Sequence, residues 1–282
     1  DYVFDIIKKH FDISPSLTPL VSDRDQNFKI TEGEKSHIFK IANSAESRSV
    51  LEMQNSALSY ISKKDDSIEI PQPVKTIDGH DILSIESTNT KYHARLLTYV
   101  DGVFLKDVKL TNGTTFSVGK FLGYLDKGLV GFDHRAAKRE FIWDVSQVSL
   151  LESNLTKDDF DLITFFINSF KHDISSLMND FPKTIIHNDG NDHNILVDSW
   201  NRVKGIIDFG DMIHSFRVIE PSVAMAYIAI EDNNFELIAS LIKGYHSIVP
   251  LSMDELKAAI YFMCLRMCVS ITMSAKRKNL FP

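Results

Sequence analysis

The chain has 282 residues, of which 44% are hydrophobic and 24% are charged. These values are typical of a globular protein with a large core, and the length is sufficient for two lobes. The formal net charge of -7 argues against a general nucleic-acid-binding surface, because such surfaces need clustered lysine and arginine. We expect no membrane-spanning segment and no leader peptide, and therefore a cytoplasmic location.

The first hundred residues predict a small antiparallel sheet with one long helix. An amphipathic helix is expected over 3–11. Apolar and alternating segments predict strands over 17–22, 28–31, 36–42, 74–77, 82–86 and 94–100. Between the third and fourth strands, the spacing of apolar residues predicts a helix over 47–62. The pair Asp78 and Gly79 indicates a hairpin turn between the two strands that flank it.

Lys40 is the candidate phosphate-binding cation of this sheet. It lies between the apolar residues Phe39 and Ile41, so its side chain should point to the opposite face of the strand. An ammonium there can pair with the phosphates of a nucleotide. On the predicted helix 47–62, Gln54 falls within the apolar face and Glu52 on the far side. We expect Gln54 to meet Lys40, with Glu52 as the alternative.

The rest of a nucleotide site is less clear, because no glycine-rich loop precedes Lys40. The segment 22–27 stands in its place, where side chains or backbone amides can donate to phosphate; a plain tight turn is the alternative. The strand that ends near residue 100 can present its backbone to the edge of a purine. The candidate nucleotide-binding residues are therefore Lys40, Gln26, Asn27, Gln54, Thr98, Tyr99 and Val100.

After Gly102 the apolar spacing becomes helical. Helices are predicted over 116–126, 143–151, 160–178, 223–230, 235–245 and 256–273, with start signals at 156–159 and 252–255. Three short apolar runs predict strands over 184–187, 195–197 and 203–207. We expect an α+β protein with an N-terminal nucleotide-binding lobe, 1–101, and a catalytic and substrate-binding helical lobe, 102–282.

The most informative segment is 187–194, HNDGNDHN, which is followed by DFGD at 208–211. Polar residues between buried strands cannot all face a core, so they should point into a site. Asp189 is expected to accept or orient the proton of an attacking hydroxyl group. Asn194 and Asp208 supply the oxygen ligands that magnesium prefers. The arrangement is typical of kinases and predicts a phosphotransferase.

The acceptor is less defined by the sequence. An amine-bearing substrate needs carboxylates and an aromatic wall near Asp189. The candidate substrate-binding residues are Asp211, Asp192, Trp143 and Glu220, and each has a structural role such as capping or packing as its alternative. A substrate carboxylate would need a cation, for which Arg135 and Arg139 are candidates.

These motifs resemble the aminoglycoside phosphotransferase and choline kinase superfamily, in which the position of Asn188 is usually Gly. Segments along nearly the whole chain resemble its hydroxylysine kinase branch, namely 25–28, 39–41, 54–55, 96–99, 141–143, 191–196 and 210–212. The chain is also similar to the kinase domain that some bacteria fuse to a pyridoxal-phosphate-dependent aminotransferase or lyase, particularly at 244–246 and 270–272.

The resemblance implies a protein-kinase-like fold of two lobes, a small antiparallel sheet with one long helix and a larger helical part. It implies Mg²⁺, ATP or GTP as the donor, and hydroxylysine as the first acceptor to test. Ethanolamine or choline, homoserine and aminoglycosides are alternative acceptors. A catalytically silent nucleotide-binding domain is the alternative from another class, because the glycine-rich loop is absent. The expected partners are a nucleotide and a small hydroxyl-bearing amine, without nucleic acid or membrane, and the oligomeric state stays open.

Overall fold

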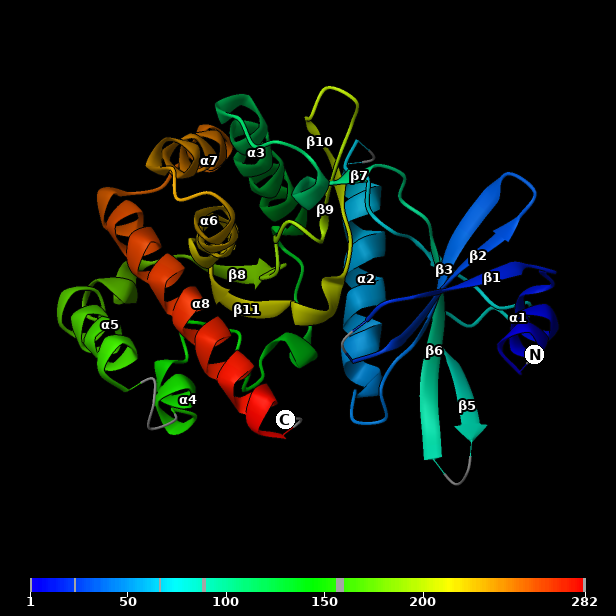
Figure 1. The fold of residues 1–282 in the computed structure, drawn as a ribbon. Coiled ribbons are helices and arrows are strands. Elements are labelled where there is room, and N and C mark those ends of the chain that lie inside the picture. Colours follow the sequence, from blue (N-terminus) through cyan, green and yellow to red (C-terminus); the bar gives the residue numbers. More distant parts are fainter. Residues whose placement is uncertain (1, 23, 66, 88–89, 156–159, 281–282) are drawn as a thin grey trace. The chain divides into compact units, whose positions relative to one another are not determined.

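The computed structural model describes the whole chain except residues 1, 23, 66, 88–89, 156–159 and 281–282. The helix start predicted at 156–159 lies outside the described residues. The chain divides into two compact units, Asp1–Asp101 and Gly102–Pro282 (Figure 1). The assignment of nucleotide binding to the first and of catalysis to the second remains a prediction.

The first unit is built on an antiparallel sheet. Its strands are β1 Ser16–Leu20, β2 Gln26–Glu32, β3 Lys35–Ile41, β4 Pro73–Val74, β5 Leu83–Ser87 and β6 Thr90–Thr98. Their order is β1-β2-β3-β6-β4, and β5 also pairs with β6. Gly79 makes a turn with a φ of 83°, but β4 and β5 each pair with β6. The predicted hairpin between the strands that flank Gly79 is therefore wrong.

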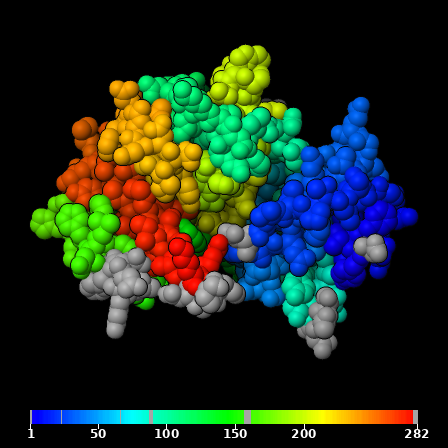
Figure 2. Space-filling model, viewed as in Figure 1, coloured from blue at the N-terminus to red at the C-terminus, as the bar shows by residue number. Residues whose placement is uncertain are grey.

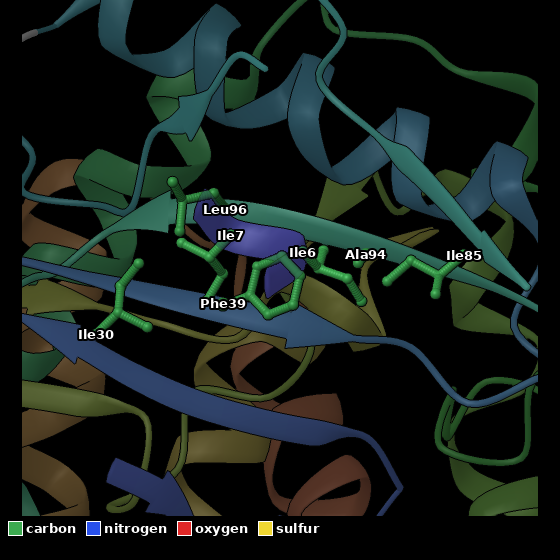
Figure 3. Close-up of a cluster of buried hydrophobic side chains, with 7 residues drawn as sticks. All are labelled: Ile6, Ile7, Ile30, Phe39, Ile85, Ala94 and Leu96. Carbon is green, nitrogen blue, oxygen red and sulfur yellow. The ribbon is translucent and has the colours of Figure 1, made fainter. Parts of the chain in front are cut away.

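Two helices lie on opposite sides of this sheet, α1 Tyr2–Phe11 and α2 Arg48–Lys64 (Figure 1). The α1 side is apolar, and Figure 3 shows its buried cluster, which consists of Ile6, Ile7, Ile30, Phe39, Ile85, Ala94 and Leu96. Because Phe39 belongs to this cluster and Ile41 packs against it, the alternation of β3 directs Lys40 to the α2 side. The predicted helix over 47–62 is confirmed by α2, whose first turn is capped by Ser47.

The second unit is mainly helical. Its helices are α3 Asn112–Leu129, α4 Val148–Ser153, α5 Phe160–Asp173, α6 Ile219–Glu231, α7 Phe235–Ile248 and α8 Met253–Leu280. The predicted capping box is confirmed: Glu255 N donates to Ser252 Oγ at 3.1 Å, and Ser252 N donates to Glu255 Oε2 at 2.8 Å. The helix predicted to begin at Trp143 begins at Val148 instead, because Asp144 caps a preceding turn by accepting from Ser146 N at 3.1 Å.

Helices α3 and α7 cross with their backbones in direct contact. A Cβ added to Gly119 of α3 would collide with the carbonyl of Leu241, and one added to Gly244 of α7 would collide with the carbonyl of Phe116. Glycine at both positions therefore permits the two helices to approach this closely.

Two small sheets complete the second unit. One has the order β10-β9-β7 and contains β7 Val103–Phe104, β9 Ile195–Val197 and β10 Val203–Ile206. The other pairs β8 Lys183–Ile186 with β11 Ile213–Phe216. The predicted strands near 184, 195 and 203 are confirmed, whereas β11 was not predicted from the sequence.

Helix α8, red in Figures 1 and 2, corrects one expectation. It is long and apolar enough, by length and composition, to cross a membrane, so the expectation that no apolar stretch reaches this length is wrong. Half of the most apolar 18-residue stretch of α8 is buried inside the protein, and core helices of soluble proteins can have the same length and apolar composition. The helix packs against α6 and α5. A cytoplasmic location therefore stays a prediction.

Candidate active site

Two polar loops of the second unit are held side by side at both ends. The loop 187–194 runs from β8 to β9, and the segment 207–212 runs from β10 to β11. Ile186 pairs with Ile213 at one end of the two connections, and Ile195 pairs with Ile206 at the other. The pairing of these strands brings together two motifs that are separate in the sequence.

Asp189 is held by three side chains. Its Oδ1 accepts from Asn191 Nδ2 and from Arg266 Nη2, both at 2.9 Å. Its Oδ2 accepts from Asn194 Nδ2 at 2.7 Å. The side chain of Asp189 is 19% exposed, so the carboxylate is fixed but still accessible.

Burial and two neighbouring carboxylates act together on the pKa of Asp189. Burial raises this pKa most, the positive charge of Arg266 lowers it, and Asp211 and Asp208 raise it again, with a result of about 7. The coulombic effect of Asp208 and Asp211 on Asp189 is consistent with their common location around one site.

The backbone before Asp189 has an unusual conformation. Asn188 has a φ of 65°, which is rare for a residue other than glycine. His187 supports this turn, since its Nδ1 accepts from Asp189 N at 3.2 Å and its Nε2 donates to Ile207 O at 3.1 Å. Burial lowers the pKa of His187 to about 4, so the imidazole is neutral. His187 therefore links the two loops through neutral hydrogen bonds.

Glu220 lies under the loop rather than in the open site. It is fully buried, and its Oε2 accepts from Asn188 N at 2.9 Å. Burial raises the pKa of Glu220 to about 7. A Cβ on Gly190 would lie 3.5 Å from Oε1 of Glu220 and 3.2 Å from Leu122, so the loop packs tightly here. This placement is a correction, because a carboxylate without exposure cannot meet the acceptor as predicted.

Behind Glu220 is a second buried carboxyl group. Asp126 on α3 is 2% exposed and accepts a hydrogen bond from the hydroxyl of Tyr245. Burial, and then the charge of Glu220, raise the pKa of Asp126 well above its usual range. Asp126 and Glu220 therefore form a buried acidic pair in which protonation is favoured.

Asn194 and Asp208 have the chemistry of ligands for a hard cation. Asn194 uses Nδ2 for both of its contacts with Asp189, at 3.0 Å to the carbonyl and 2.7 Å to Oδ2, and these contacts do not use Oδ1, the atom that could bind a cation. Asp208 is exposed and has a left-handed backbone with a φ of 61°. Such strain in a residue other than glycine is concentrated at functional sites.

No cluster of three or more His, Cys, Asp or Glu side chains suited to a metal exists within the described part of the chain. This is compatible with magnesium, which keeps several waters and uses one or two protein carboxylates together with phosphates.

The remaining acceptor-site candidates differ in their exposure and in their hydrogen-bond partners. Asp211 is 6% exposed and follows Asp208 in the same turn. Asp192 Oδ1 accepts a hydrogen bond from His193 Nδ1 at 3.1 Å, and the Asp192 side chain is 15% exposed. Arg139 donates to the carbonyls of Gly210 and Met212 at 2.9 and 3.1 Å, so it braces the second motif. Of these residues, Asp211 is the one whose charge raises the pKa of Asp189.

Arg266 on α8 was missed by the sequence analysis. It is 1% exposed, its Nη1 donates to Trp143 O at 3.1 Å, and its guanidinium lies 4.5 Å from the centroid of the Trp143 ring. The predicted role of Trp143 is therefore modified, because this ring contacts a cation of the protein itself. The available signal was a single arginine inside the apolar helical pattern 256–273.

In the first unit, a polar row crosses the face of the sheet that α2 covers. Asn27 of β2 is paired with Lys40 of β3, and Lys40 is paired with Arg95 of β6. Directly opposed residues share a face, so the three side chains are neighbours. Arg95 is 3% exposed and donates to Gln54 Oε1 at 2.6 Å and to Asn55 Oδ1 at 2.9 Å.

The helical wheel was correct, but the partner of Gln54 was not foreseen. Gln54 is 3% exposed, as predicted for the inner face, and its Oε1 accepts from Arg95 Nη2. Glu52 is on the outer face, 45% exposed, and pairs with Arg48 at 2.9 Å. The structure thus adds Arg95, a cation that the sequence analysis missed, to the neighbourhood of Lys40.

The other nucleotide candidates lie near the beginning of β2 and the end of β6. Gln26 and Asn27 belong to β2 rather than to a loop, which corrects the predicted boundary. Thr98 ends β6, and its Oγ1 accepts from Gln72 N at 2.9 Å. Tyr99 follows it, with Lys29 4.0 Å from its ring centroid, and Val100 is half-buried.

Comparison with known proteins decides the family. The model of the phosphotransferase enzyme family matches residues 16–256. The chain belongs to this family. Hydroxylysine kinase of Xenopus laevis is 31% identical over 95% of this chain and 79% of its own length, and that of Mus musculus is 28% identical over 94% and 78%. The predicted resemblance is confirmed, as are the predictions of a phosphotransferase and of a small-molecule kinase that acts on hydroxyl groups.

Solved structures of the same fold agree with this family. A microcompartment-associated aminopropanol kinase has a TM-score of 0.80 at 18% identity, covering 96% of this chain and 88% of its own. Amicoumacin kinase in complex with AMP-PNP, Ca²⁺ and its ligand has a TM-score of 0.79 at 15% identity, with coverages of 96% and 84%. The predicted α+β, protein-kinase-like fold class is confirmed.

Proposed function

We propose that this phosphotransferase is a magnesium-dependent kinase that transfers the γ-phosphoryl group of ATP or GTP to the hydroxyl group of hydroxylysine. The geometry of Asp189 carries the proposal: a fixed, 19% exposed carboxylate with donors on both oxygens, beside two further aspartates. The similarity to hydroxylysine kinases over most of the chain supports this acceptor.

Asp189 is the proton acceptor in this proposal. The acceptor oxygen forms a bond with the γ-phosphorus, and the bond from that phosphorus to the bridging oxygen of the nucleoside diphosphate breaks. The hydroxyl proton passes to the carboxylate of Asp189. Because three side chains fix the carboxylate, it does not have to reorient when the acceptor arrives.

Asn194 and Asp208 would hold the magnesium ion, with Asp211 as a further candidate. Their amide and carboxylate oxygens are the hard ligands that this ion prefers. When bound, Mg²⁺ neutralises charge on the phosphate groups. The left-handed backbone of Asp208 and the exposure of this residue are the observations that support its role.

The first unit would hold the donor. Lys40 would pair with the phosphates of a nucleotide, beside the amide of Asn27 on the same face of the sheet. Arg95 is buried, so it would add positive charge to this face without touching the phosphates. The residues after β6, Tyr99 and Val100, would face the base. The choice between ATP and GTP rests on backbone contacts that the side chains do not determine.

The experiment is an acceptor panel with the purified protein, Mg²⁺ and either ATP or GTP. The panel contains hydroxylysine, lysine, homoserine, ethanolamine, choline and an aminoglycoside, and nucleoside diphosphate release is measured for each. We expect turnover with hydroxylysine, none with lysine, which lacks the hydroxyl group, and loss of turnover in Asp189→Asn. The nucleotide affinity of Asp189→Asn, measured by isothermal titration calorimetry, should be close to that of the unsubstituted protein.

Two outcomes would remove the proposal. Turnover only with another member of the panel would keep the kinase and replace the acceptor. Nucleotide binding without turnover on every acceptor would favour the catalytically silent domain instead.

A further inference from the structure

The candidate active site contains a buried arginine, Arg266, whose role the proposed function does not yet explain. Arg266 lies within the apolar helix α8 at 1% exposure. Burial of a guanidinium group is costly unless its charge is paired and its hydrogens are bonded. Its partner is the carboxylate of Asp189, at 2.9 Å.

The two carboxylate oxygens of Asp189 have different hydrogen-bond partners, and Arg266 bonds only one of them. Oδ1 accepts from Arg266 Nη2 and from Asn191 Nδ2. Oδ2 accepts from Asn194 Nδ2. Since each carboxylate oxygen offers about two acceptor positions, Oδ1 is filled and Oδ2 keeps one position.

Arg266 is itself fixed by groups other than Asp189. Its Nη1 donates to the carbonyl of Trp143 at 3.1 Å. Its guanidinium lies 4.5 Å from the ring centroid of Trp143 and 5.6 Å from that of Tyr227. A planar guanidinium that bonds a carbonyl with one nitrogen and a carboxylate with the other fixes the orientation of the carboxylate relative to the carbonyl. A single ammonium group cannot do this.

We propose that Arg266 is a positioning residue that holds Asp189 through Oδ1 and leaves Oδ2 as the oxygen that meets the acceptor hydroxyl group. The inference rests on the proposed function, in which Asp189 is the proton acceptor. It adds a residue from α8, outside both sequence motifs, to the requirements of the reaction.

The test compares Arg266→Met with a matched control, Arg217→Met. Arg217 is another arginine of the second unit that bonds both a carboxylate and a carbonyl, since its Nη2 donates to Glu255 Oε1 at 3.1 Å and to Pro250 O at 3.2 Å. We expect kcat of Arg266→Met to fall by about 100-fold, the loss typical of a misplaced catalytic group, with KM for both substrates unchanged. Arg217→Met should keep kcat within about threefold, because surroundings remote from the reacting atoms contribute stability rather than rate.

Chemical rescue separates orientation from folding. In Arg266→Ala, millimolar methylguanidinium should enter the vacated space beside the Trp143 carbonyl and Asp189 and raise kcat by about tenfold. The same additive should not raise kcat of Arg217→Ala, because that variant still has Arg266 beside Asp189. It should not raise kcat of Asp189→Ala either, because that variant lacks the carboxylate that the cation would position.

Several results would overturn the inference. One is a kcat of Arg266→Met equal to that of Arg217→Met; another is a rise in KM with kcat unchanged, which would make Arg266 a substrate-binding residue. If both uncharged variants fail to fold, Arg266→Lys decides, and a kcat equal to that of the unsubstituted protein would refute the need for a guanidinium. Absence of turnover by the unsubstituted protein on the whole panel would remove the proposed function first, and the positioning role with it.

Discussion

Helix α2 in the first unit and helix α8 in the second each bury a polar side chain that bonds a group of opposite character, but the two side chains have opposite roles. Gln54 of α2 accepts from a buried cation on the sheet, Arg95. Arg266 of α8 is the buried cation, and it donates to a carboxylate on a loop, Asp189. The neutral amide orients a cation without cancelling its charge, whereas the ion pair orients an anion and partly cancels it.

The difference indicates what each region is built to attract. In the first unit, Lys40 and Arg95 are directly opposite on neighbouring strands, so this face of the sheet carries two positive charges. In the second unit, the charges of Asp208 and Asp211 raise the pKa of Asp189, and such a group of carboxylates favours a cation. A phosphate donor and a magnesium ion are the complementary partners in the proposed function.

The largest stability effect is expected for Arg95→Met. The substitution leaves the amide oxygens of Gln54 and Asn55 buried without this donor, and we expect a loss of about 3 kcal/mol in the free energy of unfolding of the first unit. Urea unfolding, with hydrogen exchange measured for peptides from 1–101, gives the value. Lys75→Met is the control, because Lys75 forms an exposed ion pair with Asp81; an equal loss in both variants would refute the importance of the buried network.

The second prediction concerns pH and the buried acids of the second unit. The pKa of Glu220 is raised from 4.5 to about 7 in the folded protein. A raised carboxyl pKa favours the protonated folded state, so this stability is complete below the unfolded pKa and is lost as pH rises through 7. Between pH 5 and pH 8, the free energy of unfolding of Glu220→Gln should therefore decrease by about 2 kcal/mol less than that of the unsubstituted protein.

Tryptophan fluorescence measures this effect in the correct unit, because the two tryptophans, Trp143 and Trp200, are both in the second unit. Glu152→Gln is the control, since Glu152 forms an exposed pair with Lys171. The remaining slope in Glu220→Gln should come from groups that include Asp126, whose pKa is also raised by burial and by Glu220. An unchanged slope in Glu220→Gln would show that Glu220 is ionised in the folded protein at low pH.

A smaller effect is expected for Gln54→Leu. The change removes one of the two amide acceptors of Arg95 and leaves Asn55 in place, so we expect a loss of about 1 kcal/mol. Thermal unfolding by circular dichroism would measure it. If Gln54→Leu destabilises the protein as much as Arg95→Met, the Asn55 contact contributes nothing and the network reduces to a single bond.

Local patterns were sufficient to predict much of this structure. The alternation around Lys40, the inner position of Gln54 and the capping box at Ser252 each depend on residues close in sequence, and each is present. The loop 187–194 was recognised because its polar residues interrupt buried strands. Local rules therefore identified the elements that carry the candidate residues.

The partners of those residues required the tertiary structure. Arg266 lies 77 positions from Asp189, and no local pattern connects them. Glu220 has the residue type of a substrate contact, and only its burial under Asn188 assigns it to the support of the loop. Strand β11 is short and includes His214 and Ser215, so its pairing with β8 decides its structure rather than its own periodicity.

The smallest effect is expected for Glu52→Gln, and it decides the alternative left open for Lys40. Glu52 is 45% exposed and pairs with Arg48 four residues before it on α2. Pairs of this kind contribute little, so stability should change by less than about 0.5 kcal/mol. Nucleotide affinity, measured by calorimetry, should also stay the same, whereas Lys40→Met should weaken it. A weakening in Glu52→Gln that matches the effect of Lys40→Met would mean that Glu52 orients the lysine when nucleotide binds, and that the inner position of Gln54 serves Arg95 alone.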